Sequence, residues 1–393
     1  MIAARVGQIV ESATLRLAEQ AEQMRLDGID VVDLTAGQPD FPTPDAAAAG
    51  GKRAIDEHRT RYTATAGIGE LREAIAARLA SEAGVPYAPA QVLVSPGAKA
   101  SLYFAALALF DPGDEVLIPT PFWVSYPEQV RLAAAAPVFV SCAESHGFKL
   151  QASDLERAIT PRTKAVILNY PANPTGACYR REELEPLADV CTRRGLWVLS
   201  DEIYSKLIFD GRPFHSIARL GTMAERTVIV GGMSKSYSMT GWRIGFAAGP
   251  AAVIAAMEKL QSHVTSNATS ISQWASLAAL RDGEQELAAR VAEFQSRRDA
   301  IVAGLNAIPG IRCVRPEGTF YAFPNVSGCF RPHGVASGEQ LAARLLERAR
   351  VAVVPGEAFG SAEHVRLSFA TSRSRIDEGL RRIAAELGGV RGD

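Results

Sequence analysis

The sequence predicts an α/β protein, with a mainly parallel sheet between two layers of helices and a smaller α/β unit after it. Short apolar runs alternate with helical patterns through the middle of the chain, as in sheets whose parallel strands are joined by helices. From about Pro250 the pattern becomes mainly helical, and a shorter mixed segment follows. The length of 393 residues exceeds what one ordinary core accommodates, which favours two or three domains.

Six apolar runs in the first part are expected to be buried strands, and helices are expected between most of them. The strands are residues 92–94, 115–118, 165–168, 196–199, 227–230 and 244–248. The helices are residues 99–110, 122–134 and 181–194. Each run is short and apolar, as expected for strands that are covered on both faces.

The remaining elements belong to the two ends of the chain. A helix at residues 12–26, with Ser12 as a candidate cap, and an extended run at 31–35 are expected to pack with the smaller unit. Beyond Pro250 the expected helices and extended runs are 251–260, 272–280, 284–307, 318–323, 339–350, 351–354, 365–370 and 374–387. The expected division is an N-terminal arm of residues 1–44, a large domain of residues 45–285 and a small domain of residues 286–393.

The composition argues against several classes of protein. Lys and Arg number 42 against 43 Asp and Glu, so no basic excess attracts nucleic acid or an anionic membrane. Apolar runs stay far below the roughly 18–20 residues of a membrane span, and the N-terminus lacks the features of a signal peptide. Cysteines and histidines show no metal-binding spacing, no GxGxxG motif follows the early strands, and no P-loop motif is present. We therefore expect a cytoplasmic protein without a metal site and without nucleic-acid or membrane partners.

Lys235 lies in a loop between two of the expected strands. Two glycines and the apolar run 227–230 come before it, and Arg243 follows eight residues later. An amine nucleophile and a fixed cation at this place suit a lysine that holds a carbonyl cofactor as an imine, with the arginine binding the cofactor's phosphate. The other interpretation is a solvated lysine in a Gly/Ser turn.

Polar side chains at other strand ends favour the first interpretation, because ligands of open parallel sheets bind beyond the carboxyl ends of the strands. Asp201 follows the run 196–199, and a carboxylate there needs a cation or a protonated ring as its partner. Tyr204 lies three residues further on and could reach the same ligand. Prolines and a glycine constrain the backbone around Asn173, so its side chain points in a fixed direction.

Other candidate residues have a structural alternative. Gly97, Ala98 and Lys99 begin a helix, where free N–H groups suit a phosphate, although an ordinary strand-to-helix turn would look the same. Trp123 brings a flat indole to the sheet edge or packs in the core. Arg366 lies in an apolar strand pattern and needs an anion, which is either a bound carboxylate or a structural ion-pair partner.

Together these segments resemble the class I/II pyridoxal-phosphate-dependent aminotransferases of fold type I, and most of all the bacterial subgroup related to aspartate aminotransferase. The resemblance extends over nearly the whole chain. Its segments are residues 36–44, 62–69, 95–99, 121–127, 173–176, 201–204, 234–245 and 353–356, together with Arg366. It implies a large domain with a mainly parallel sheet of the seven-stranded type, a smaller α/β C-terminal domain, and pyridoxal phosphate as the cofactor.

The resemblance also assigns contacts to the cofactor ring. Lys235 would bind the cofactor as a Schiff base and then move the substrate proton as general base and acid. Asp201 would keep the pyridine nitrogen protonated. Asn173 and Tyr204 would hydrogen-bond the ring oxygen, and Trp123 would stack on the ring.

Contacts to the phosphate and the substrate are implied in the same way. The implied phosphate contacts are Gly97, Ala98, Lys99, Ser234, Arg243 and, from a neighbouring subunit, Tyr62. Tyr62 would make a homodimer part of the active site. The implied substrate contacts are Gly37, Trp123, Asn173 and Arg366. Of these, Arg366 would bind the α-carboxylate.

At Gly232 the chain differs from many relatives, which have a phosphate-binding serine three residues before the lysine. Ser234 is the hydroxyl that could take the place of that serine. Alternatively, the helix N-terminus at Ala98 binds more of the phosphate charge. The difference concerns how tightly the cofactor is held, not which cofactor it is.

The resulting hypothesis is transfer of an amino group between an L-amino acid and a 2-oxo acid through a Schiff base on Lys235. Aspartate or glutamate with 2-oxoglutarate is the first choice, because residues 121–127 and the region of Thr14 are most similar to aspartate-using members. The sequence identifies no second cation for a dicarboxylate, and aromatic, prephenate or arogenate, and branched substrates stay open. The alternative is another pyridoxal-phosphate reaction, such as elimination, replacement, cyclisation or oxidation. A ligand sensor is disfavoured, because no spare segment for a DNA-binding domain is found.

Overall fold

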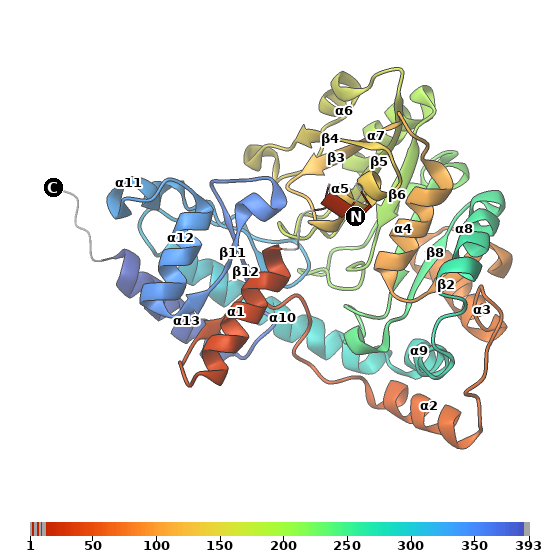
Figure 1. The fold of residues 1–393 in the computed structure, drawn as a ribbon, viewed down its shortest axis with the longest axis horizontal. Coiled ribbons are helices and arrows are strands. Elements are labelled where there is room, and N and C mark those ends of the chain that lie inside the picture. Colours follow the sequence, from red (N-terminus) through yellow and green to blue (C-terminus); the bar gives the residue numbers. More distant parts are fainter. Residues whose placement is uncertain (1, 4–5, 8, 10–12, 389–393) are drawn as a thin grey trace.

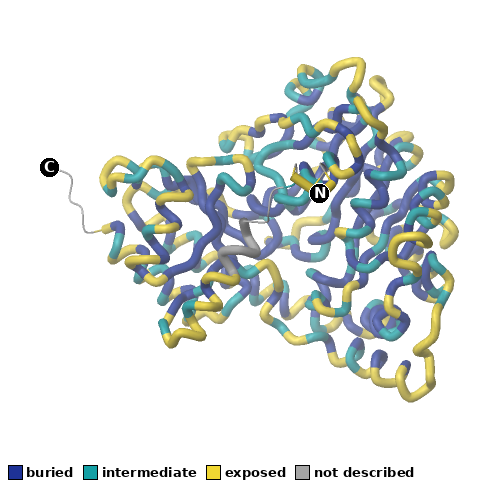
Figure 2. The backbone as a smooth tube through the Cα atoms, viewed as in Figure 1, coloured by how far each residue is buried: buried dark blue, intermediate teal, exposed yellow. Residues whose placement is uncertain are grey.

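The computed structural model describes residues 2–3, 6–7, 9 and 13–388, and its elements form two groups around two sets of strands (Figure 1). Buried residues concentrate along the strands of both groups, and exposed residues cover the outer helices and loops (Figure 2). The predicted cap Ser12 lies outside the described residues. None of the described helices combines the length and the apolar character that a bilayer-spanning helix needs.

The larger group is built on a seven-stranded sheet with the strand order β2-β8-β7-β6-β5-β3-β4. The strands are β2 (Val92–Ser95), β3 (Glu115–Thr120), β4 (Ala136–Ser141), β5 (Thr163–Asn169), β6 (Trp197–Asp201), β7 (Thr227–Gly232) and β8 (Gly245–Ala248). The adjacent strands β4, β3, β5, β6 and β7 pair in parallel, whereas β8 runs antiparallel to both β7 and β2. The predicted α/β class with a mainly parallel sheet of seven strands is confirmed.

Helices cover both faces of this sheet, because the strands present apolar side chains to each face in alternation. One face packs against α4 (Ala98–Leu109), α5 (Ser125–Leu132) and α8 (Ala251–Val264). The other packs against α2 (Asp45–Asp56), α3 (Gly69–Arg78), α6 (Ala152–Ala158), α7 (Arg181–Arg194) and α9 (Ser270–Asp282). The sequence does not predict α2, α3, α6 or β4, and the helix expected at 122–134 begins earlier than α5.

The smaller group contains two short sheets. In one, β1 (Val32–Asp33) pairs in parallel with β10 (Val351–Ala352). The other has the order β11 (Val354–Pro355), β12 (Val365–Ser368) and β9 (Tyr321–Ala322), so the single run expected at 351–354 is divided between two sheets. The helices of this group are α1 (Ala13–Leu26), α10 (Glu284–Asn306), α11 (Phe330–His333), α12 (Gly338–Arg344) and α13 (Arg373–Leu387).

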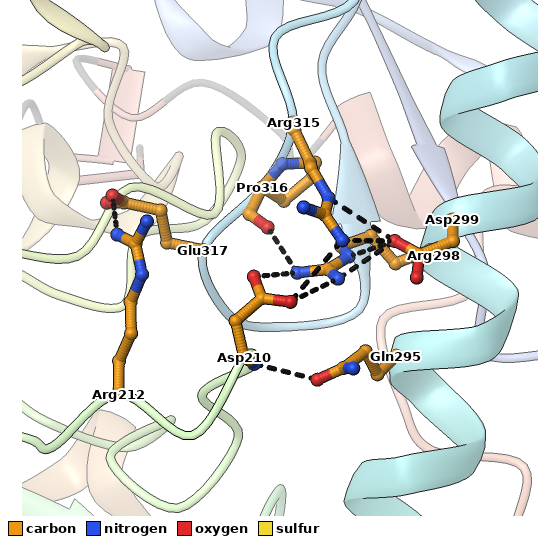
Figure 3. Close-up of polar contacts among 8 residues, drawn as sticks. All are labelled: Asp210, Arg212, Gln295, Arg298, Asp299, Arg315, Pro316 and Glu317. Atoms are coloured by element: carbon orange, nitrogen blue, oxygen red, sulfur yellow. Dashed lines mark hydrogen bonds and ion pairs between the residues drawn. The ribbon is translucent and has the colours of Figure 1, made fainter.

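A network of ion pairs joins the two groups (Figure 3). Arg298 of α10 is fully buried and donates to both carboxylate oxygens of Asp210, at 2.8 and 2.9 Å. It also donates to the carbonyl oxygen of Pro316 at 3.3 Å. The next residue, Glu317, pairs with Arg212. Because Asp210 and Arg212 follow β6 and residues 316–317 precede β9, the network ties the smaller group to the large sheet.

Candidate active site

A cavity of about 820 Å³ lies between the two groups of elements, beyond the carboxyl ends of the parallel strands. It is lined by most of the residues that the sequence predicted, namely Gly37, Ala98, Lys99, Trp123, Asn173, Asp201, Tyr204, Ser234, Lys235, Arg243 and Arg366. Gly97 does not line the cavity but lies directly before Ala98 and against Arg243. Tyr62 is also not among the lining residues, and its side chain is 91% exposed.

Lys235 reaches into the cavity from the loop between β7 and β8. Its Nζ donates a hydrogen bond to the carbonyl oxygen of Gly37. Burial, together with the positive charges of Arg366 and Arg243, lowers the pKa of Lys235 to about 8. Near neutral pH this amine therefore deprotonates far more easily than an ordinary lysine, which is what a nucleophile requires.

Asp201 ends β6 and is buried in the floor of the cavity. Its Oδ2 accepts a hydrogen bond from the hydroxyl of Tyr126 at 2.7 Å, and its Oδ1 accepts one from the backbone N–H of Ile203 at 3.2 Å. Burial raises the pKa of Asp201 to about 6. None of the ion pairs formed by the described residues includes Asp201, so the carboxylate lacks the cationic partner that its burial calls for.

A relay of amides joins Asp201 to the loop after β5. The side-chain amide of Asn169 donates to the backbone carbonyl of Asp201 at 2.9 Å, and its Oδ1 accepts from the backbone N–H of Asn173 at 2.9 Å. Asn173 Oδ1 in turn accepts from Arg366 Nη1 at 3.0 Å. Neither Asn169 nor Tyr126 had been given a role from the sequence, because their partners lie on other elements.

Arg366 is buried on β12, and none of the carboxylates in the described part of the chain pairs with it. Nη2 donates to the carbonyl of Thr35 at 2.9 Å, and Nε has no partner among the described residues. The guanidinium lies 4.3 Å from the ring centroid of Tyr321 and 5.0 Å from that of Phe359. The structural ion pair considered from the sequence is not found among the described residues, so this cation is available to a bound carboxylate.

Tyr204 is buried after β6, and its hydroxyl lies 3.2 Å from the hydroxyl of Tyr321 on β9. Both side chains line the cavity. Trp123 lines it as well, and its ring packs edge-on against Tyr126 with the centroids 5.3 Å apart. A flat indole and a phenol therefore flank the space next to Asp201, where an aromatic ring can bind.

The N-terminus of α4 and Arg243 form a cationic corner of the cavity. The first N–H groups of this helix, at Ala98 and Lys99, have no acceptor within the helix. A Cβ on Gly97 would lie 2.4 Å from Arg243 Nη2, so glycine lets the guanidinium lie against the backbone at the helix start. A Cβ on Gly245 would lie 2.1 Å from the nitrogen of Ala98, so this second glycine brings β8 against the same turn. The corner suits a phosphate.

The side chain of Lys99 has a different environment from its backbone N–H. Its Nζ lies 4.9 Å from the ring centroid of Trp123, and none of the described carboxylates pairs with it. Burial lowers the pKa of Lys99, and the positive charge of Arg243 lowers it further. The sequence predicts a role mainly for the backbone N–H of Lys99, and the structure adds its side chain to the cavity as a cation without a carboxylate partner among the described residues.

Comparison with known proteins connects this geometry to a family. The sequence profile of aminotransferase class I and II matches residues 29–383, which is most of the chain. The chain belongs to the class I and II aminotransferase family. It is thus a pyridoxal-phosphate-dependent transferase of nitrogenous groups, as the sequence had predicted.

Individual relatives of this aminotransferase are similar over their full length. The aspartate aminotransferase of Geobacillus stearothermophilus is 46% identical over 383 residues, which are 97% of this chain and 98% of that protein. The aspartate/prephenate aminotransferase of Cereibacter sphaeroides is 45% identical over 392 residues, 98% of each protein.

Solved structures agree with this placement. The aspartate aminotransferase of Rhizobium meliloti superposes with a TM-score of 0.96 at 42% identity. The superposition covers 100% of this chain and 100% of the other. The Thermus thermophilus aspartate aminotransferase with maleate gives a TM-score of 0.94 at 41% identity, covering 98% of this chain and 100% of the other.

The residues of the cavity fit pyridoxal phosphate. Lys235 has a lowered pKa, as a Schiff-base lysine requires. Asp201 is a buried carboxylate that lacks a cation among the described residues and can pair with a protonated pyridine nitrogen. Arg243 and the N-terminus of α4 provide donors for the phosphate.

Proposed function

We propose that this aminotransferase exchanges the amino group of aspartate or glutamate with a 2-oxo acid such as 2-oxoglutarate. The proposal is carried by one observation: Arg366 and Lys99 are two cations in one cavity without a carboxylate partner among the described residues. A dicarboxylic substrate satisfies both, with its α-carboxylate on Arg366 and its distal carboxylate on Lys99. The solved Thermus thermophilus relative supports this, since the maleate in that structure is also a dicarboxylate.

The chain would hold the cofactor by contacts on three sides. Lys235 would be its covalent attachment, and Asp201 would hold a proton at the pyridine nitrogen. Tyr204 and Asn173 would hydrogen-bond the ring oxygen, and Trp123 would cover one face of the ring. The phosphate contacts would be Gly97, the backbone N–H groups of Ala98 and Lys99, Ser234 and Arg243. When bound, pyridoxal phosphate supplies an electron sink that makes the Cα proton of an amino acid acidic.

Lys235 would carry out the proton transfer. Its uncharged Nζ would accept the proton from the substrate Cα as general base and would then donate it as general acid to C4′ of the cofactor. Arg366, held by Asn173 and Thr35, fixes the α-carboxylate so that the Cα–H bond faces the lysine. Gly37 lies beside Lys235, because its carbonyl accepts from that lysine. A Cβ on Gly37 would lie 3.8 Å from the hydroxyl of Tyr321, the ring against which Arg366 packs.

Replacing the lysine tests the core of this proposal. Lys235→Ala should abolish the visible absorbance of the lysine-bound cofactor and lower the transamination rate by roughly 10³-fold or more, because it removes the general base and acid. Lys259→Ala, on the outer helix α8 and not among the residues that line the cavity, is the control and should leave both unchanged. A Lys235→Ala protein that kept a borohydride-reducible cofactor would refute the assignment. Ammonia release, or keto acid formed without an acceptor, would refute plain transamination.

Replacing Lys99 tests the choice of substrate. Lys99→Met should lower kcat/KM for aspartate by about 10- to 100-fold, the usual loss for one hydrogen bond to a charged group. The rate with a monocarboxylic donor such as alanine should change little, because that donor has no distal carboxylate. Steady-state kinetics with both donors measures the ratio. Equal losses with aspartate and alanine would assign Lys99 to the cofactor alone.

We further propose a homodimer in which each subunit completes the site of the other. Tyr62 supports this, since its large side chain is 91% exposed and is not among the residues that line the cavity of its own chain. A phenol in that position suits a contact to the phosphate in a second copy. We also propose a cytoplasmic location, which the five free cysteine thiols support because reduced thiols persist there.

A further inference from the structure

The loop that carries Lys235 separates the active-site cavity from a second, smaller one. This chamber has a volume of about 60 Å³ and lies between the loop, the turn after β6 and helix α3. Ser234 and Lys235 line the large cavity, whereas the next two residues, Ser236 and Tyr237, line the chamber. A molecule in the chamber would therefore contact the loop on the side opposite to the active-site cavity, into which Lys235 reaches.

Two polar atoms of residues that line the chamber are buried without a partner among the described residues. One is the hydroxyl oxygen of Tyr237, a residue only 4% exposed. The other is Nη1 of Arg78, whose guanidinium lies 5.5 Å from the centroid of the Tyr237 ring. Arg78 uses its Nε on Glu82 at 2.9 Å and its Nη2 on Glu284, so Nη1 alone is left over. A buried polar atom without a hydrogen-bond partner destabilises the fold, so both atoms call for a partner.

Glu202 provides a third polar side chain at the chamber wall. It is 4% exposed, and its Oε1 accepts hydrogen bonds from Ser200 at 2.8 Å and from Ser216 at 2.6 Å. Its backbone N–H donates to the carbonyl of Val230 at 2.8 Å, on the strand that leads into the lysine loop. Glu82 and Lys206 also line the chamber, whereas Asp201, Tyr87 and Tyr170 do not line it but interact electrostatically with Glu202. The volume exceeds the roughly 10–15 Å³ that one water molecule needs, so the chamber can hold water.

We propose that the chamber holds a water cluster bound by Tyr237, Arg78 and Glu202, and that Tyr237 is thereby a positioning residue for Lys235. The water cluster supports the side of the loop that faces the chamber and limits how far Lys235 Nζ can move from its contact with Gly37. This inference rests on the proposed role of Lys235. It adds a second support to the loop beyond the strand pairing of β7 and β8.

Removing the hydroxyl of Tyr237 tests the positioning role. Tyr237→Phe should lower kcat by about tenfold, a moderate loss for a misplaced catalytic group, with KM for the amino donor unchanged. It should also shift the midpoint of the pH titration of the lysine-bound cofactor absorbance. Tyr87→Phe is the matched control, because Tyr87 is also buried but donates to the carbonyls of Ala224 and Thr227 at the other end of β7. Equal kcat and midpoint in Tyr237→Phe and wild type, or the same change in the control, would overturn the proposal.

The water cluster itself is tested in a crystal of the wild-type protein, with and without cofactor, at a resolution that shows ordered water. We expect water within hydrogen-bond distance of the Tyr237 hydroxyl and of Arg78 Nη1 in both crystals. A dry chamber would overturn the proposal even if the Tyr237→Phe protein did not fold. A wild-type protein without lysine-bound cofactor would instead refute the proposed function, and the density would still decide whether the cluster exists.

Discussion

At the scale of single residues, glycines allow backbone segments of the site to lie close together, and Gly232 is one of these glycines. A Cβ on Gly232 would lie 2.9 Å from the carbonyl oxygen of Ile244, 3.0 Å from Cα of Gly245 and 3.1 Å from Cδ1 of Ile203. A serine here, as in many relatives, would press on the neighbouring strand. The absence of that serine is therefore a packing requirement of this chain, and Ser234 is the hydroxyl next to Lys235 that lines the cavity.

Gly232→Ser should accordingly destabilise the protein rather than improve phosphate binding. We expect a loss of about 1–3 kcal/mol, the usual cost of overpacking a filled site, together with faster loss of cofactor because Ile203 lies next to Asp201. Gly241→Ser is a suitable control, because a Cβ on Gly241 meets nothing within 4 Å. Thermal melting and cofactor dissociation measure the two effects. Unchanged stability in Gly232→Ser would show that the strands give way more easily than the distances indicate.

The sequence allowed the chemistry-bearing residues to be predicted but not their partners. Lys235, Asp201 and Arg366 could be found because a charged residue next to or within a buried apolar run needs a ligand. The hydroxyl of Tyr126 on Asp201 and the unpaired Nζ of Lys99 could not, because both depend on distances between elements that are far apart in the sequence. The expected roles of these residues stay predictions until variants are measured.

At the scale of elements, one helix could not be predicted because it contains glycines, and one strand could not be predicted because it is exposed. Helix α2 contains Gly50 and Gly51, which lower helix propensity. In the structure both permit close packing, since their Cβ atoms would lie 2.6 Å from Ala278 Cβ and 2.7 Å from the Trp242 ring. Strand β4 is an edge strand that contains Pro137 and is largely exposed, so it shows neither a buried run nor a clean alternation. The helix expected at 339–350 consists of α12 and a π-helical turn, Leu345–Ala349, that follows it directly.

The ion-pair network of Figure 3 makes the contact between α10 and the large sheet depend on pH. The guanidinium of Arg298 holds the pKa of the Asp210 carboxyl below its usual value. The folded protein therefore binds fewer protons at this group than the unfolded chain. Its contribution to stability is complete above the usual aspartate range and is lost as the pH falls through the lowered pKa.

Asp210→Asn should therefore cost about 3 kcal/mol at neutral pH, because it leaves Arg298 buried with one carboxylate fewer. The variant should also lose less stability than wild type as the pH falls from neutral into the acidic range, because only wild type has this carboxyl to protonate. Urea unfolding at several pH values measures both effects. Asp282→Asn is the control, since Asp282 forms no ion pair with any described residue. Parallel stability curves for wild type and Asp210→Asn would show that the pair does not contribute.

At the scale of the whole molecule, the proposed dimer predicts that two inactive variants rescue each other. Lys235→Ala and Tyr62→Ala remove residues that would meet only across the subunit interface. In a mixed dimer, one site then lacks both residues and the other has both. After exchange of subunits in an equal mixture, about a quarter of all sites should be intact, because half of the dimers are mixed and each has one such site.

The measurement is the activity of the mixture relative to each variant alone. Recovery to roughly this fraction of wild-type activity supports shared sites. Tyr62→Ala mixed with itself is the control and should show no recovery. A mixture whose activity is only the average of its two components would mean that Tyr62 does not act in the partner's site.

The buried guanidinium of Arg366 also has a consequence for the kinetics of the enzyme. The amino acid and the oxo acid share the α-carboxylate that this group would bind, so both use the same cavity in turn. Each is then a competitor in the other's half of the exchange. With one partner in large excess, the rate should pass through a maximum and decline, because that partner occupies the enzyme form meant for the other. The ratio of the two metabolite pools would therefore set both the speed and the direction of nitrogen flow.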